Sequence, residues 1–473
     1  MTPSPSPRSV PAFTIVSSRL WPLPLLGLLA CAHAPPPEPE APAPHLREAA
    51  EESPLEADAD HHDPVPDPAS SGEVSLGGML AYADGHSPVL AVARSTRSRA
   101  DAARTAASLL LPANPELSVA AGPRLGGAGT GLDVQISLTQ QLQIAGQRGL
   151  RIEAADRLSD LTNAEIEQIR WDVHCDVHAG FHRALVERER ARLSERVVVF
   201  QREVLRTVER QISAGEVSPL ILRLAQAEVA QAEQQLVGAQ QAYLASRIRL
   251  GQLAGWPVAT PPTPAGVVDA PRDPPPGERL LAIARDRLPS LRAGAARTRE
   301  ADARARLADR QAWPQPSIGV QYNREGNPSS EGPYDIVMGV VSTPIPSFQT
   351  NQGERAGARA DAIVARAELD AAQRLLEGQI AEARSEVAAA AQRTRAYGTE
   401  ILPRFEENLT LLRRTFELGE IDILALSTGR ERFLRIQSDA LGAQLDYFVA
   451  LAGLERVVGV DLWRDDHHEE DQP

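Results

Sequence analysis

The chain of 473 residues has no lysine, few aromatic residues and only two cysteines. Phe, Trp and Tyr make up 4% of the residues, and 42% are hydrophobic, which is little for a globular enzyme. All 49 basic residues are arginine, as the bias of a GC-rich genome would produce. The net charge of −14 argues against nucleic acid as a partner, because its phosphates require a basic surface.

Other absences narrow the function further. The sequence contains no glycine-rich nucleotide loop, no nucleophile elbow and no Cys-x-x-Cys pair. We therefore expect no enzymatic activity and no cofactor. The sequence also lacks any run of eighteen uninterrupted apolar residues, which argues against a transmembrane helix. A membrane protein of this kind must use a β-barrel or a lipid anchor alone.

The first thirty residues are typical of a signal peptide. Arg8 and Arg19 precede an apolar stretch that ends at residue 30, which has the length of a signal core and is too short to span a bilayer. The letters LLAC at 28–31 resemble a bacterial lipobox, so we expect Cys31 to be acylated, with simple signal cleavage nearby as the alternative. The next residue is not aspartate, which would indicate inner-membrane retention, so the outer membrane is the expected destination.

The rest of the sequence contains two similar halves. Residues 213–217 (SAGEV) match residues 417–421 (ELGEI) at an offset of 204, and each half has the same expected order of a helix, two short strands, a very long helix, a Gly-Glu turn and a long helix. We therefore expect two repeats, at 74–256 and 277–462, joined by a linker at 257–276. A signal peptide at 1–30 and a lipid-anchored disordered linker rich in proline and acidic residues at 31–73 precede them, and a disordered acidic tail at 463–473 follows.

The long helices are expected at 149–213 and 353–418, and each would reach roughly 95 Å if continuous. Pro403 should kink the second one. The helices after the turns carry heptads in which large residues face alanines, a pattern that favours coiled-coil packing. The large positions are Leu222, Val229, Leu236, Tyr243 and Leu250, and then Leu426, Phe433, Ala440, Tyr447 and Leu454 in the second repeat. Helices of this length need lateral partners, so a bundle is implied.

Alternating apolar residues predict strands of about ten residues, the length of a tilted strand that crosses a bilayer. The residues predicted to face lipid are Leu132, Val134, Ile136 and Leu138 in the first repeat and Ile336, Met338 and Val340 in the second, with Tyr334 in the same row and Ile318, Val320 and Tyr322 on the neighbouring strand. Four strands per chain cannot close a barrel, and open edges are not tolerated in hydrocarbon. The barrel must therefore be shared among several chains, and the helices must form a tube beyond it.

In this arrangement residues 74–462 resemble the TolC family of outer-membrane factors. The resemblance rests on the order of short motifs, namely 114–117 (NPEL), 140–142 (QQL) before 146–148 (GQR), the two Gly-Glu turns and 401–403 (ILP). Residues 343–346 (TPIP) and 351–354 (NQGE) are most similar to the heavy-metal branch, the CzcC- and CusC-like proteins.

The resemblance implies a mainly α fold with a transmembrane β-barrel contribution. The expected assembly is a homotrimer with a twelve-stranded barrel in the outer membrane of a Gram-negative bacterium and an α-helical tunnel in the periplasm. Its implied partners are outer-membrane lipid, a periplasmic adaptor and an inner-membrane pump of the RND type. Such a duct passively conducts metal ions or small toxic compounds and performs no chemistry of its own.

The resemblance also places the gate and the adaptor contact at the two helix–helix turns. The residues concerned are Gly215, Glu216, Gly419, Glu420 and Asp422. Some family members have gate aspartates six and nine residues after the second turn glycine, where this chain has Ala425 and Thr428. An acidic ring would therefore have to use the turn carboxylates, and a solvated turn is the alternative.

Three histidines are the weak candidates for a metal site. His174, His178 and His182 are spaced four residues apart on one long helix, so they project from the same face. No second element in the sequence completes a site, so we predict no metal, and a polar helix face is the preferred interpretation. Cys175 is expected to be a small packed residue.

Three other functions remain open from the sequence. The duct of a type I protein secretion system would have the same fold, and neighbouring genes for an RND pump or an ABC exporter would separate the two. A periplasmic coiled-coil lipoprotein scaffold is a second alternative, although duplicated pairs of membrane-length strands argue against it. A metal-sequestering lipoprotein built on the histidine row is the third.

Overall fold

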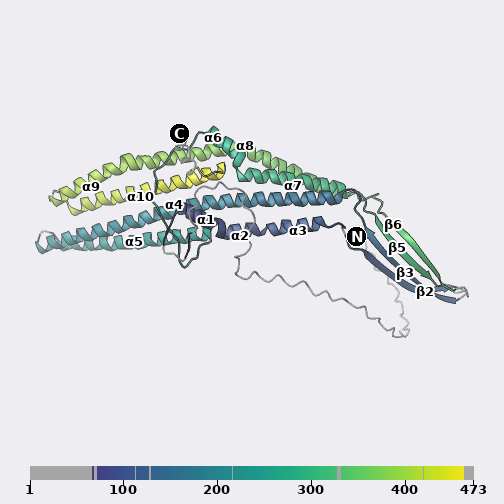
Figure 1. The fold of residues 1–473 in the computed structure, drawn as a ribbon. Helices are drawn as coiled ribbons and strands as arrows, with labels where there is room; N and C mark the ends of the chain where they lie inside the picture. The colour runs from purple at the N-terminus through teal and green to yellow at the C-terminus, as the bar shows by residue number, and fades with distance from the viewer. Residues whose placement is uncertain are drawn as a thin grey trace, which may run out of the picture. The chain divides into compact units, whose positions relative to one another are not determined.

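A computed structural model describes residues 66–68, 72–111, 113–126, 129–215, 217–326, 332–418 and 420–462 (Figure 1). The predicted signal peptide, Cys31 and the acidic tail lie outside the described residues, as do Glu216 and Gly419 of the two turns.

In both halves shorter helices precede two long strands, which are followed by two long helical segments. The first half comprises β1 (Glu73–Val74), α1 (Leu76–His86), α2 (Pro88–Ser95), α3 (Arg97–Ser108), β2 (Glu116–Gly126), β3 (Gly129–Gln141), α4 (Gln147–Ser213) and α5 (Pro219–Ala254). The second comprises α6 (Gly277–Arg287), α7 (Pro289–Gln311), β5 (Ser317–Glu325), β6 (Tyr334–Ser342), α8 (Gln352–Ala396), a π-helical turn η1 (Tyr397–Ile401), α9 (Leu402–Glu417) and α10 (Ile423–Val458). Between them β4 (Thr263–Pro264) pairs in parallel with β1.

The long helices differ between the halves. α4 runs without interruption for 67 residues. Its counterpart is divided into α8 and α9 by the π-helical turn, which ends two residues before Pro403. Proline has no backbone N–H and its ring clashes with the carbonyl of the preceding turn, so the regular ladder cannot continue there. The helix therefore widens locally into a π-helical turn just before Pro403, and the kink expected at this residue stays a prediction.

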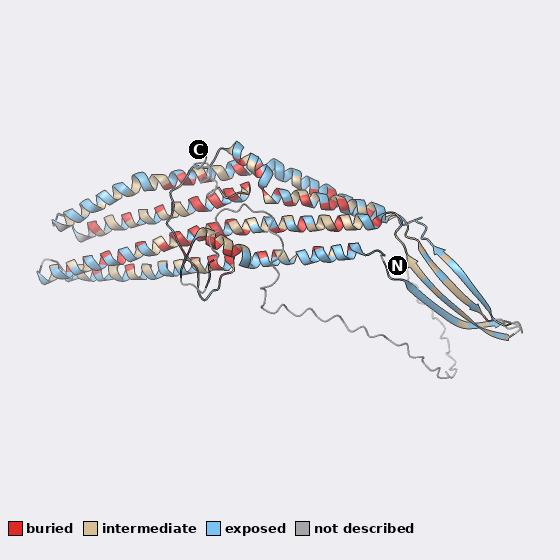
Figure 2. Cartoon of the chain, viewed as in Figure 1, coloured by how far each residue is buried: buried red, intermediate tan, exposed pale blue. Residues whose placement is uncertain are grey.

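The helices pack laterally, as their length requires. α4 contacts α5, α7 and α10, and α8 contacts α7 and α10, so the two halves share one layered bundle. Two clusters of buried side chains lie within it. The first core joins α1, α2, α4 and α5 through Met79, Leu90, Phe181, Leu185 and Leu250, and the second core joins α6, α8 and α10 through Leu280, Leu376, Ile380, Phe448 and Leu454. Figure 2 shows that buried residues are distributed along the helices.

Arginines attach the linker between the halves to the helices. Arg188 of α4 is buried and donates to the carbonyl oxygens of Pro264, at 2.8 Å, and Gly266. Arg247 of α5 and Arg384 of α8 donate to the carbonyl oxygens of other linker residues. These bonds satisfy proline-rich backbone that has few N–H partners of its own.

The four long strands form one antiparallel sheet in the order β2-β3-β5-β6. The central pair β3–β5 joins the two halves, since Ile136 lies opposite Tyr322 and Leu138 opposite Val320. Within the described chain, β2 and β6 each have one edge without a strand partner. None of the described helices has the length and apolar character needed to cross a membrane.

Candidate functional site

The two faces of the sheet differ in polarity. Residues opposite one another in an antiparallel ladder point to the same side, so the register assigns every side chain to a face. The apolar face carries Leu117, Val119, Ala121, Pro123, Leu125, Leu132, Val134, Ile136, Leu138, Ile318, Val320, Tyr322, Val337 and Val341. The register also places Thr130, Gln140, Gly339 and the opposed residues Arg324 and Asp335 on this face. On the polar face β2, β3 and β5 present mainly Ser, Thr, Gln, Asn and Gly.

This register corrects part of the predicted lipid face. Ile336, Met338 and Val340 lie opposite Asn323, Gln321 and Gly319, which places them on the polar face. Tyr334 shares this position because it lies opposite Glu325. A change of one residue in the pairing register of a hairpin moves every side chain of the strand to the other face of the sheet. Both rows of side chains in β6 are largely apolar, so their alternation alone does not reveal which row lies on the apolar face of the sheet. Leu132, Val134, Ile136 and Leu138 do share one face with Val320 and Tyr322.

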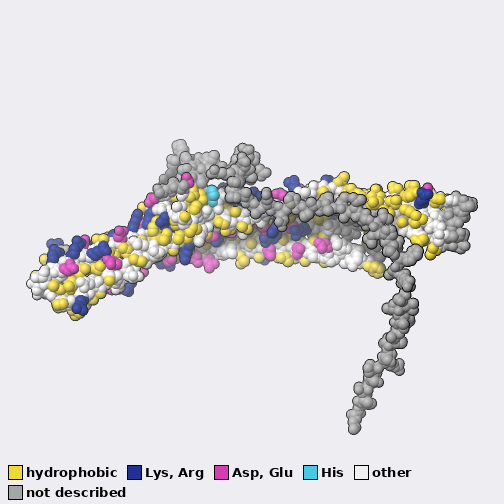
Figure 3. Space-filling model, turned by 90° about the horizontal axis from the view of Figure 1, so that it is seen from below, with side chains coloured by type: hydrophobic (Ala, Val, Ile, Leu, Met, Phe, Trp, Pro, Cys, Tyr) yellow, Lys and Arg dark blue, Asp and Glu magenta, His cyan; other side chains and the backbone are white. Residues whose placement is uncertain are grey.

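The apolar face is not covered by other described residues. Leu125, Val337 and Val341 are 77%, 72% and 76% exposed. In Figure 3 hydrophobic side chains gather over the strands, whereas charged side chains are spread over the helices. A contiguous apolar surface of this kind marks a site of contact with another protein or with lipid.

The helix–helix turns have well-defined ends. Gly215 adopts a left-handed conformation with φ of +79°, which glycine reaches without strain, and ends α4. In the second turn the Asp422 carboxylate accepts a hydrogen bond of 2.8 Å from the Ala425 N–H and caps α10. The Glu420 side chain is exposed, and its backbone N–H donates to the Thr415 carbonyl. The described turn residues therefore have clear structural roles, and a gate at this place stays a prediction.

A cluster close to these turns joins the two helical hairpins. Phe200 and Val204 of α4 pack with Ala225 of α5 and Leu426 of α10. The Arg430 guanidinium lies over the Phe200 ring, with its carbon 3.4 Å from the ring centroid, and Arg413 approaches the same ring at 5.2 Å. Burial, reinforced by the charge of Arg413, lowers the pKa of Arg430 to about 10. No motif in the sequence marks this contact, so it could not be predicted.

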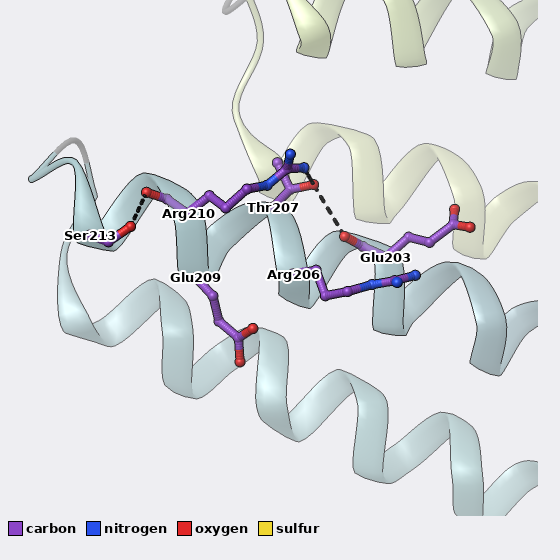
Figure 4. Close-up of a pocket in the computed structure, with 6 residues that line it drawn as sticks. All are labelled: Glu203, Arg206, Thr207, Glu209, Arg210 and Ser213. Atoms are coloured by element: carbon purple, nitrogen blue, oxygen red, sulfur yellow. Dashed lines mark hydrogen bonds between the residues drawn. The ribbon is translucent and has the colours of Figure 1, made fainter.

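The surface of α4 beside this cluster is polar. Figure 4 shows an open depression lined by Glu203, Arg206, Thr207, Glu209, Arg210 and Ser213. The Ser213 hydroxyl donates to the Arg210 carbonyl at 2.7 Å and the Thr207 hydroxyl to the Glu203 carbonyl at 3.1 Å. The hydroxyls are thus bonded within the helix, the Arg210 guanidinium folds back to donate to the Thr207 hydroxyl at 3.3 Å, and the Glu203, Arg206 and Glu209 side chains are exposed.

The histidine row faces the end of α10. The buried His178 Nδ1 lies 2.7 Å from one oxygen of the buried Glu455 carboxylate, whose other oxygen accepts from the Leu462 N–H. The buried His182 ring stacks on Phe448, and its Nδ1 donates to the His178 carbonyl. His174 Nε2 lies 3.7 Å from an Asp461 oxygen. The preferred interpretation as a polar helix face is therefore wrong for His178 and His182, which are part of the packed interior.

The electrostatics of the row follow from burial and from Glu455. Burial alone would lower the pKa of His178, but the hydrogen bond and charge of Glu455 outweigh it and raise the pKa. Burial, with the neighbouring His178, lowers the pKa of His182 to about 3, so its ring stays neutral. Cys175 is fully buried, and burial raises the pKa of its thiol. In the described ranges no three His, Cys, Asp or Glu side chains converge closely enough to hold a metal ion.

Comparison with known proteins identifies the fold. A family model described as outer membrane efflux protein matches residues 82–256 and 280–460, which is more than half of the chain. The chain belongs to the outer membrane efflux protein family. The predicted resemblance to the TolC family and the prediction of an outer-membrane efflux duct are thereby confirmed. Members of the family work with an adaptor and an inner-membrane pump.

Individual relatives of this outer membrane efflux protein agree with the assignment. The cobalt-zinc-cadmium resistance protein CzcC of Cupriavidus metallidurans is 24% identical over 321 residues, which are 67% of this chain and 75% of CzcC. The solved structure of CusC matches with a TM-score of 0.64 at 13% identity, over 82% of this chain and 92% of CusC. The outer-membrane channel OprN matches with a TM-score of 0.64 at 18% identity, over 81% and 89% of the two chains. The predicted fold, mainly α with a contribution to a barrel, is confirmed.

Proposed function

We propose that three copies of this chain close their sheets into one twelve-stranded barrel, from which the helices continue as a tunnel through the periplasm. The observation that carries this proposal is the sheet itself. It has two free edges, and it has one apolar and one polar face. Only a closed ring of strands satisfies both features in a membrane, because hydrocarbon offers no partner for the edge N–H and C=O groups.

The dimensions of the strands support a barrel that crosses the membrane. β2 has 11 residues and β6 has 9, which matches a tilted strand across a bilayer. In the closed barrel the edge of β6 in one copy pairs with the edge of β2 in the next. The apolar face then contacts lipid, and the polar face lines a water-filled lumen.

The helical hairpins supply the part of the duct that must open and close. The Phe200 cluster and Arg430 join the α4–α5 hairpin to α10 near the turns, so separation of the hairpins requires breaking that contact. We propose that Gly215, Glu216, Gly419, Glu420 and Asp422 form the adaptor contact and the periplasmic gate.

The duct conducts passively and has no enzymatic activity of its own. We propose that a periplasmic adaptor and an inner-membrane pump of the RND type deliver metal ions or small toxic compounds to it. Support for metal ions comes from CzcC, which is named for resistance to cobalt, zinc and cadmium. An ABC exporter as the functional partner, together with unchanged metal tolerance after deletion of the gene, would instead favour the type I secretion duct.

We further propose that Cys31 is acylated and anchors each copy to the outer membrane. Mass spectrometry of the mature N-terminus tests this directly. A chain that begins with diacylated or triacylated Cys31 supports the anchor, and a chain that begins at an unmodified residue contradicts it.

The assembly is tested by semi-native gel electrophoresis of detergent-extracted outer membranes. We expect an SDS-resistant species near three times the chain mass of 50.9 kDa that converts to monomer on boiling. A monomer that is released from the membrane once the lipid anchor is removed would contradict the duct and favour a coiled-coil scaffold.

A further inference from the structure

Charged residues on the polar face of the sheet occur only at its ends. Among the described residues of β2, β3, β5 and β6, the register places four charged side chains on this face, namely Glu116, Arg124, Asp133 and Glu325. Glu116 begins β2 at the end of the sheet that leads to the helices. The other three lie together at the opposite end, next to the hairpin connections. The whole middle of the face is uncharged.

The three side chains at the hairpin end form one network across three strands. Arg124 of β2 places its Nε 3.0 Å from an Asp133 oxygen of β3 and its Nη2 2.9 Å from a Glu325 oxygen of β5. The Gly326 N–H donates to the other Asp133 oxygen at 2.8 Å. The network therefore connects both halves of the chain, and each of its side chains is about 40% exposed.

The charges of this network do not cancel. Two carboxylates face one guanidinium, which leaves one excess negative charge in each copy. Both carboxylates contact Arg124, so one guanidinium is shared between two negative charges. Three copies around a common axis would carry three excess negative charges at one level of the lumen.

Resting on the proposed barrel, we infer that Arg124, Asp133 and Glu325 form a cation-selective ring at the outer mouth of the duct. Rings of acidic side chains favour cations because they raise the local concentration of counter-ions and repel anions. Glu325 supplies the excess charge. Arg124 holds the two carboxylates in place, and Asp133 and the Gly326 backbone fix the position of Arg124 within the sheet. The cargo that such a mouth favours is a hydrated cation, monovalent or divalent.

Planar-bilayer recordings of the purified trimer in a potassium chloride gradient test this ring. The variant Glu325→Gln keeps the shape of the side chain and leaves the Arg124–Asp133 pair intact. The potassium-to-chloride permeability ratio should fall at least about twofold in Glu325→Gln, and it should rise in Arg124→Gln, because the two changes alter the ring charge in opposite directions.

The matched control is Asp335→Asn. Asp335 lies opposite Arg324, one position along from the pair of Glu325 and Tyr334, but on the apolar face. It therefore loses the same charge at the same level of the barrel, outside the lumen, and its permeability ratio should equal that of the wild type. SDS resistance of every variant is checked first, so that an altered ratio reports selectivity and not disassembly.

The outcomes separate the two proposals. The selective ring would be overturned if, in conducting trimers, Glu325→Gln changed the permeability ratio no more than Asp335→Asn does. The network would then be only a contact that holds the strands together. Failure of the wild-type chain to form any SDS-resistant trimer would contradict the proposed duct, and the ring with it. Zinc chloride in place of potassium chloride then extends the same comparison to a divalent cation.

Discussion

The helical cores and the sheet represent two opposite ways of treating apolar side chains. In the cores Met79, Leu280 and Leu454 have no exposed surface. On the sheet Leu125 and Val341 are more than three-quarters exposed, and none of the residues of β2, β3, β5 and β6 whose burial the structure describes is buried. Both regions use apolar residues, but only the cores complete their packing within one chain.

This difference indicates which parts of the protein fold on their own. Burial of side chains in the two cores stabilises the bundle in the single chain. The sheet contributes hydrogen bonds between its own strands, but in the proposed barrel its apolar face and its two edges would gain their stabilisation from lipid and from neighbouring copies. Substitutions in the cores should therefore act on the chain, and substitutions in the sheet should act on the assembly.

The largest effect is expected in the second core. Phe448→Ala removes a buried ring that stacks on His182 at 3.8 Å between centroids, and it should lower the free energy of unfolding by about 3–5 kcal/mol. Denaturant unfolding followed by helical circular dichroism measures this. Val449, the next residue, is 40% exposed, and Val449→Ala is the control, with an expected change below about 1 kcal/mol. Equal losses of stability in Phe448→Ala and Val449→Ala would contradict the burial of Phe448 in the second core.

The next effect separates the faces of the sheet. Ile136→Arg places a charge on the apolar face near the middle of β3 and should destabilise the membrane-inserted trimer by about 2–4 kcal/mol per chain. Met338→Arg, near the middle of β6 on the polar face, should have a much smaller effect. The temperature at which the SDS-resistant species dissociates measures both. The reverse order would return Met338 to the lipid side and contradict the register.

A pH dependence is expected from His182. Because its pKa is lowered from an ordinary value near 6.5 to about 3, the neutral ring stabilises the fold above pH 6.5, and this contribution is lost as the pH falls toward 3. At pH 4.5 the loss should be about 3 kcal/mol. Denaturation midpoints of wild type and His182→Gln between pH 7 and 4.5 test this. Parallel curves would show that protonation of His182 does not matter for stability.

The smallest effect is expected at the turns. Asp422→Ala removes the side-chain cap of α10 and should destabilise its first turn by about 1 kcal/mol. Hydrogen exchange of the amides at the start of α10 should become faster. Ser218 occupies the equivalent position before α5 but makes no such hydrogen bond, so Ser218→Ala should leave exchange at the start of α5 unchanged. An equal response at both turns would contradict the capping role.

Several features of the fold could be predicted from short stretches of sequence. The spacing of apolar residues indicated the long helices to within a few residues, and Pro403 indicated where the second of them loses regularity. Alternation indicated four strands, and Gly215 marked the first turn. Each of these depends on backbone geometry and on neighbours within a few positions, so the information is local.

The contacts that carry the candidate site were decided by the tertiary structure. Whether the row of Ile336 and Met338 faces lipid depends on the register with β5, and a pattern that alternates equally well in either register cannot specify it. The spacing of His178 and His182 predicted a shared helix face, but Glu455, which lies 277 residues away from His178, decided that His178 is buried and paired. The contact of Arg430 with Phe200 likewise has no local signal.

By itself, then, the sequence determined the elements, their order and their duplication, because periodicity and turn residues act through the nearest neighbours along the chain. Only the tertiary structure decided which face of each strand and helix is covered, and by what. That choice depends on residues hundreds of positions apart, such as Arg124 and Glu325 or His178 and Glu455, which meet only after the two halves have packed together.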